Sequence, residues 1–128
     1  MQEDLTHQLQ RLADEEYCYL TTIGRVSGRP HEIEIWFVVR GSSIYLLSGS
    51  HSSDWLKNLR KEPAVTVRIA GQVFSGTARL VTDGEEEMTV RYRMAEKYQE
   101  WEEGKKLSEW ARTAQVVGVD LHSNEAAT

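Results

Sequence analysis

Cysteine and long apolar runs are nearly absent from this sequence of 128 residues. Its single cysteine, Cys18, has no partner for an internal disulfide, and a lone thiol is typical of proteins in a reducing compartment. No apolar run approaches the roughly 20 residues that a membrane-spanning helix needs. The first ten residues, MQEDLTHQLQ, are too polar for a signal peptide. We therefore expect a cytoplasmic protein that has no membrane partner.

Positive charge is also in deficit. The chain has 15 Lys and Arg against 20 Asp and Glu, a net charge of −5, which is the wrong sign for a general nucleic-acid binder. We therefore expect no nucleic-acid partner. Several basic residues in the first 70 positions nevertheless either hold a small anion or belong to a solvated surface of mixed charge. They include Arg25, Arg29, Lys57, Arg60, Lys61 and Arg68.

Internal repeats, low-complexity tracts and linkers are absent as well, so the sequence predicts one domain over residues 1–122 and a flexible tail over 123–128. A domain of this length buries roughly two-thirds of the surface of its unfolded chain, so it needs no disulfide or structural metal.

The apolar pattern changes period along the chain, from helical spacing to alternation and back. Hairpin-length links join most of the predicted strands, which favours an antiparallel sheet. The expected fold is therefore mainly β with peripheral helices, a six-stranded antiparallel split β-barrel. The predicted strands are 17–23, 31–39, 44–47, 64–69, 72–81 and 115–121, and the predicted helices are 5–16, 54–61, 82–101 and 106–111.

The second predicted strand is unusual because its two halves differ. Glu32 and Glu34 alternate with isoleucines in the first half, whereas the second half, 36–39, is apolar on both faces. A partner subunit, a helix or a ligand must cover the second face.

The turn 24–29, Gly-Arg-Val-Ser-Gly-Arg, is the first candidate site. Its glycines allow a sharp turn and a close approach of backbone N–H groups, and its arginines offer charged donors for phosphate or carboxylate oxygens. The segment fits neither a P-loop nor a dinucleotide fingerprint. It is either a phosphate-binding turn or a hairpin turn made soluble by arginines.

The second candidate site is the segment 48–55, Ser-Gly-Ser-His-Ser-Ser-Asp-Trp, which leads into a predicted helix. Free N–H groups at a helix N-terminus favour an anion or a polar ring edge, although the segment also reads as a helix cap in a long loop. No histidine lies at a metal-ligand spacing from Cys18 or another histidine, so no metal is expected.

Two stretches resemble the deazaflavin-dependent nitroreductase family: YLTTIGRVSGRPHEIEIW and DWLKNLRKEPAVTVRIAGQVFSGTARLV. The first resembles a family strand that ends in Thr-Thr and runs into Gly-Arg-Lys-Ser-Gly-Lys-Pro-Arg, and the second resembles its Trp-x-x-Asn-Leu-x-x-x-Pro-x-Val-x-Val block. The family is similar in fold to the flavin-binding split barrels of the pyridoxamine-phosphate oxidase type, which are usually homodimers with cofactor at the subunit interface. The resemblance thus implies a homodimer, whose partner would cover residues 36–39.

The resemblance also implies roles for individual residues. Those that it places on the phosphate side of the cofactor are Arg25, Ser27, Gly28 and Arg29; near the ring system it places Ser48, Gly49 and Ser50, and around the pocket Trp55 and Asn58. This chain has His31 where the family often has arginine and Val26 where it has lysine. The reduced basic lining suits FMN as well as the polyanionic coenzyme F-420.

The function that follows is hydride transfer from a reduced deazaflavin, coenzyme F-420, to an electron-poor small molecule such as a quinone, nitroaromatic or enone. In such an enzyme the cofactor supplies the reactivity, and the protein supplies orientation and at most a proton. The candidate proton donors are Ser50, His51 and Tyr98. Alternatives are an FMN-dependent oxidoreductase, a non-catalytic module that holds flavin, haem or tetrapyrrole, and a barrel that dimerises and binds nothing.

Overall fold

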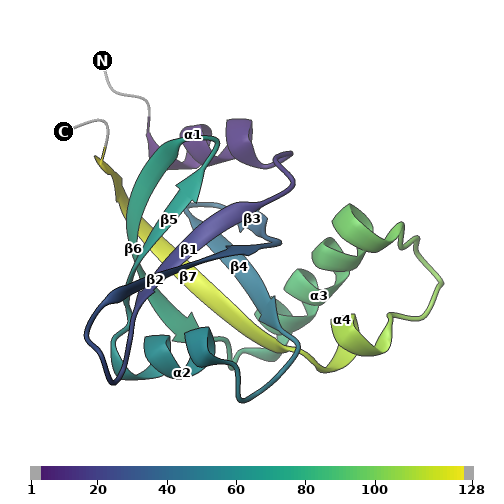
Figure 1. The fold of residues 1–128 in the computed structure, drawn as a ribbon. Coiled ribbons are helices and arrows are strands. Elements are labelled where there is room, and N and C mark those ends of the chain that lie inside the picture. The colour runs from purple at the N-terminus through teal and green to yellow at the C-terminus, as the bar shows by residue number, and fades with distance from the viewer. Residues whose placement is uncertain (1–3, 126–128) are drawn as a thin grey trace.

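Seven strands form one antiparallel sheet in the computed structural model, which describes residues 4–125. The sheet order is β2-β1-β5-β6-β7-β4-β3, and Figure 1 shows it curled, with α1 at one end, α2 at the other, and α3 and α4 to one side. The strands are β1 (Cys18–Ile23), β2 (Pro30–Ile35), β3 (Val38–Arg40), β4 (Ser43–Ser48), β5 (Ala64–Ile69), β6 (Gln72–Leu80) and β7 (Gln115–Asn124). The helices are α1 (Leu5–Leu12), α2 (Asp54–Lys61), α3 (Gly84–Gln99) and α4 (Glu109–Thr113).

The curl of the sheet follows from its connectivity. Strands β2 and β3 occupy opposite edges of the sheet, yet only Trp36 and Phe37 separate them along the chain. The three Cα–Cα steps from Ile35 to Val38 span about 11 Å at most, so the two edges must approach one another. The prediction of a mainly β, antiparallel split barrel is therefore confirmed.

The predicted count of six strands is wrong because the stretch 31–39 bends instead of running straight. At the bend, the Phe37 N–H donates to the Tyr98 hydroxyl (3.0 Å), and Lys97 Nζ donates to the Phe37 carbonyl (2.9 Å). Side chains of α3 thus satisfy the backbone groups of Phe37, so the chain leaves one edge and joins the other.

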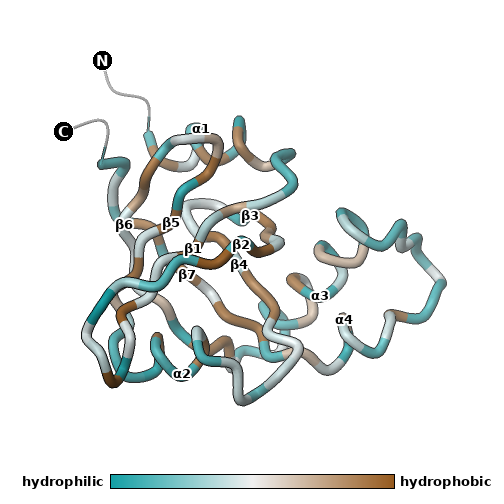
Figure 2. The backbone as a smooth tube through the Cα atoms, in the orientation of Figure 1, coloured by the Kyte–Doolittle hydropathy of each residue, from teal (hydrophilic) through white to brown (hydrophobic). Residues whose placement is uncertain are grey.

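The apolar second half of that stretch is covered by helices. Phe37 is fully buried in the barrel core with Leu20 and Ile44, whereas Val38 packs in a second cluster with Val90 and Met94 of α3. The sequence left a partner subunit, a helix or a ligand as the element that covers the second face, and in the structure a helix, α3, packs against Val38. Figure 2 shows that β4 is hydrophobic along most of its length, and all of its residues after Ser43 are buried.

Several predicted boundaries are corrected. Helix α1 ends at Leu12 and not at residue 16, and α4 begins at Glu109. Helix α3 begins after Asp83 and not at residue 82, because the Asp83 side chain accepts from the Glu86 N–H and caps the helix.

The C-terminal strand is longer than predicted. Ser123 pairs with Ser75 of β6, and the two hydroxyl oxygens lie 2.9 Å apart. The strand runs to Asn124, so the tail cannot begin at 123; residues 126–128 of that tail lie outside the described part. Within residues 4–125, no helix is long and apolar enough to cross a bilayer.

Candidate functional site

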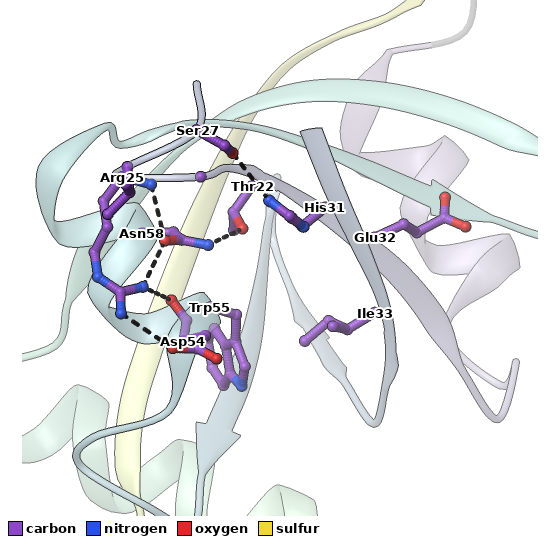
Figure 3. Close-up of a pocket in the computed structure, with 11 residues that line it drawn as sticks. Thr22, Arg25, Ser27, His31, Glu32, Ile33, Asp54, Trp55 and Asn58 are labelled. Carbon is purple, nitrogen blue, oxygen red and sulfur yellow. Dashed lines mark hydrogen bonds and ion pairs between the residues drawn. The ribbon is translucent and has the colours of Figure 1, made fainter. Parts of the chain in front are cut away.

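A cavity of about 530 Å³ lies between the β1–β2 turn, β2 and the first turns of α2 (Figure 3). This volume is in the range of small-molecule sites. The residues that line it are Thr22, Gly24, Arg25, Val26, Ser27, His31, Glu32, Ile33, Asp54, Trp55 and Asn58.

The turn that forms one wall is closed by its own backbone. The Gly24 N–H donates to the Arg29 carbonyl (2.8 Å), and the Gly28 N–H donates to the Gly24 carbonyl (2.9 Å). Gly28 has a φ of 70°, a left-handed conformation that favours glycine. A Cβ on Gly24 would lie 2.5 Å from Ser27 Oγ and 2.8 Å from His31 Nε2. Gly24 therefore lets these two side chains pack directly on the backbone.

Asn58 connects this turn to α2 and β1. Its Oδ1 accepts from the Arg25 N–H (3.1 Å) and from Arg25 Nη1 (2.9 Å), and its Nδ2 donates to Thr22 Oγ1 (3.2 Å). Asn58 is 5% exposed and Thr22 is 1% exposed, so these hydrogen bonds form away from water. The sequence predicted Asn58 as a pocket residue, and the structure adds that it positions the turn.

The guanidinium of Arg25 is held on the α2 side of the cavity. Arg25 Nη2 forms an ion pair with Asp54 Oδ1 at 3.1 Å, and Lys61 Nζ donates to the Arg25 carbonyl at 2.8 Å. Asp54 thus balances the charge of Arg25. Both terminal nitrogens of the Arg25 guanidinium already have protein partners. Contact between Arg25 and a cofactor stays a prediction.

The opposite wall is contributed by β2. Side chains alternate along a strand, and Figure 3 shows His31 and Ile33 turned toward the cavity while Glu32 points away. Glu32 forms an ion pair with Arg68 at 3.1 Å. Together with Trp55, Ile33 gives the cavity an apolar side opposite its polar turn. In the sequence, His31 stood out only because the family often has arginine at this position. The alternation of side chains along β2, which puts His31 on the same face as Ile33, could have indicated that it faces the cavity.

The other predicted cofactor contacts do not line this cavity. Ser48 is buried and its Oγ lies 2.9 Å from Ser53 Oγ, while Gly49 packs against the Trp110 ring. Ser50 lies in the same loop, whose serine hydroxyls bond to one another and to its backbone. The structure therefore brings together only part of the predicted set. Inside the cavity are Arg25, Ser27, Trp55 and Asn58; outside it are Gly28, Arg29, Ser48, Gly49 and Ser50.

None of the three predicted proton donors lines the cavity either. Ser50 and His51 lie in the exposed loop before α2. Tyr98 lies at the bend in the sheet, where its ring stacks on Trp36 with centroids 4.4 Å apart. Burial raises the pKa of Tyr98 to about 12. Tyr98 therefore serves the fold at this bend.

The described residues offer no evident metal centre. Among residues 4–125, no three side chains of His, Cys, Asp or Glu are grouped so that they could hold a metal ion. The lining of the cavity offers hydrogen-bonding groups, one guanidinium, one imidazole, two carboxylates and an apolar side.

The fold is an antiparallel split β-barrel, and solved structures share it. A protein from Listeria innocua provisionally described as a pyridoxamine 5′-phosphate oxidase has a TM-score of 0.73 and 18% identity over 94% of this chain and 96% of its own. The haem storage protein HutZ from Vibrio cholerae has a TM-score of 0.71 and 18% identity over 94% and 92%. An F420-H2 dependent reductase has a TM-score of 0.62 and 22% identity over 81% and 93%.

The family is given by the sequence match. Residues 2–117 match the F420H(2)-dependent quinone reductase family, and the chain belongs to this family. The protein is thus an oxidoreductase that depends on the deazaflavin coenzyme F-420.

Proposed function

We propose that the protein binds reduced coenzyme F-420 in the cavity beside the β1–β2 turn and reduces a quinone there. The observation that carries this proposal is the division of the cavity: a polar wall with Arg25 and Ser27 faces an apolar side with Ile33 and Trp55. A cofactor with an anionic tail and a flat ring system has the same division.

The residues of the cavity would bind and orient this cofactor. The turn 24–29 would offer the Ser27 hydroxyl to the phosphate side, and the Arg25 guanidinium, which pairs with Asp54 and Asn58, would place positive charge nearby. Trp55 would offer a flat apolar surface to the ring. When bound and reduced, the deazaflavin supplies the hydride that the acceptor receives.

A homodimer is part of this proposal. Strand β2 pairs with β1 on one side, and among the described residues no strand pairs with its other side. The cavity is bounded by this edge strand, so a second copy could close it. Light scattering during gel filtration tests this proposal; a monomer at all concentrations, with and without cofactor, would contradict it. We also propose a cytoplasmic location, which the free thiol of Cys18 favours.

The proposed function is tested by binding and then by turnover. Apo-protein is titrated with coenzyme F-420 and with FMN while tryptophan fluorescence is followed, and Trp55→Phe is compared with the matched control Trp101→Phe, which lies outside the cavity. We expect F-420 to quench the fluorescence and Trp55→Phe to lose most of the signal. Oxidation of the reduced deazaflavin by a quinone, a nitroaromatic and an enone then ranks the acceptors.

The alternatives predict other results. Binding of FMN alone would assign the protein to flavin-dependent chemistry. Tight binding of haem without turnover would favour a carrier, a role suggested by the fold that the chain shares with a haem storage protein. If no cofactor binds, the proposal is wrong.

A further inference from the structure

The cavity holds few groups that can supply a net positive charge. Asp54 balances the guanidinium of Arg25 at 3.1 Å, and Glu32 points away from the cavity and pairs with Arg68. Among the lining residues, His31 is the remaining ionisable side chain that faces inward. The net charge that an entering anion meets therefore depends on the protonation of one imidazole.

The hydrogen bonds around Ser27 depend on the same proton. Ser27 Oγ accepts from the Arg29 N–H (3.1 Å) and lies 3.4 Å from His31 Nε2. A hydroxyl has one proton, and a neutral ring whose Nε2 is an acceptor can take it. A protonated ring donates from both nitrogens, so Ser27 then accepts from His31 and its own proton is free to donate elsewhere. Protonation of His31 thus adds a charge to the cavity and, for the neutral tautomer that carries its proton on Nδ1, a hydrogen-bond donor toward Ser27.

We propose that His31 and Ser27 form a proton-dependent contact for the anionic phosphate of the cofactor, which binds when the His31 ring is protonated. This inference rests on the proposed function and names the residue pair that regulates its affinity. The charged groups near the pair are Arg25 and Arg29 on the turn, Asp54 and Lys61 on α2, and Glu32 on β2. Arg29 is exposed at the turn, and the other four make the contacts described above.

The direction of the pH dependence follows from proton linkage. An anion favours the charged ring, so the complex takes up a proton at pH values where the free ring is neutral. An ordinary imidazole titrates near pH 6.5. The dissociation constant of the cofactor therefore rises with pH, by up to about tenfold per pH unit, over the range in which the free ring is neutral and the bound ring is charged.

The test compares the wild type with His31→Gln and His31→Arg by isothermal titration calorimetry with coenzyme F-420 between about pH 5.5 and 8.5, a range that spans the titration of an ordinary imidazole. Each titration is run in two buffers of different ionisation enthalpy, which reports proton uptake directly. We expect His31→Gln to bind about tenfold more weakly than wild type at the acidic end and equally at the alkaline end. We expect His31→Arg to bind about tenfold more tightly than wild type at the alkaline end, with proton uptake lost in both variants.

The comparison separates this inference from the proposed function. Titration of the cofactor itself is common to all three proteins and cancels between them. If F-420 binds and the three proteins share one pH profile, the inference about His31 is wrong and the proposed function stands. If F-420 binds to none of them at any pH, the proposed function itself fails. His51→Gln, in the exposed loop, is the matched control and should follow the wild type.

Discussion

Replacing Asn58 by alanine should destabilise the protein and release the turn beside the cavity. The substitution removes three hydrogen bonds, two from Arg25 and one to Thr22. A net contribution of about 1 kcal/mol for each gives a loss of about 3 kcal/mol in the free energy of unfolding. The Thr22 hydroxyl, 1% exposed, would lose the partner that Asn58 gives it, so the loss should not be smaller.

Thermal and urea unfolding measure this loss. With an unfolding entropy of about 0.27 kcal/mol/K for 128 residues, a loss of about 3 kcal/mol lowers the melting temperature by about 10 °C. Lys57→Ala, on the exposed face of the same helix, is the matched control and should change stability by less than about 0.5 kcal/mol. Asn58→Asp should lose less than Asn58→Ala, because the carboxylate still accepts from Arg25 and the Thr22 hydroxyl can donate to it.

The result that refutes this reasoning is a melting temperature of Asn58→Ala within about 2 °C of the wild type, less than a 1 kcal/mol change would produce. In that case the hydrogen bonds around Asn58 would contribute little to the fold. An equal drop in the Lys57 variant would also refute it, because the effect would then belong to the helix rather than to the buried amide.

Three further substitutions test other parts of the structure. The Arg79 guanidinium forms an ion pair with Glu86 at 2.6 Å and lowers the pKa of the Glu86 carboxyl to about 2. The ionised carboxylate therefore contributes stability that is fully present above the ordinary Glu pKa of 4.5 and is lost as the pH falls through about 2. In Glu86→Gln, the urea midpoint of unfolding should therefore depend less on pH between about 2 and 4.5 than it does in the wild type. An unchanged pH dependence would contradict a stabilising ion pair at Glu86. Gly24→Ala should weaken F-420 binding several-fold, because a Cβ has no room there, whereas Gly84→Ala, with open space around the Cβ, should bind normally; equal dissociation constants would show that the turn plays no part in binding. Tyr98→Phe removes the acceptor of the Phe37 N–H and should cost about 1–3 kcal/mol in urea unfolding while leaving the turnover number unchanged, and a large fall in turnover at full stability would restore this residue as the proton donor.

Local patterns were sufficient for the elements and for much of the turn chemistry. Alternation marked the strands, as in β5 with its buried Val65 and Val67. The link between the predicted strands 64–69 and 72–81 is only two residues long, Ala70 and Gly71, and both residues have the positive φ of a tight hairpin turn. These features depend on residues that are neighbours in the sequence, so the sequence alone determines them.

The bend at residues 36–37 was decided by tertiary structure. The stretch 31–39 looks like one strand because no turn or breaker residue interrupts it. The groups that break it are Lys97 and Tyr98, about 60 residues away, which hydrogen-bond to Phe37. Backbone groups take the partners that the fold places beside them, and periodicity cannot reveal such distant partners.

The composition of the site divides in the same way. Gly24, Arg25, Ser27 and Asn58 were identifiable because turn residues and a family-like block mark them in the sequence. That Asn58 holds Arg25, and that His31 faces the same cavity, follows only when β2 and α2 are packed against the turn. Sequence alone therefore determined which segments could bind a cofactor, and tertiary structure decided which side chains share the cavity, because long-range packing sets the distances between them.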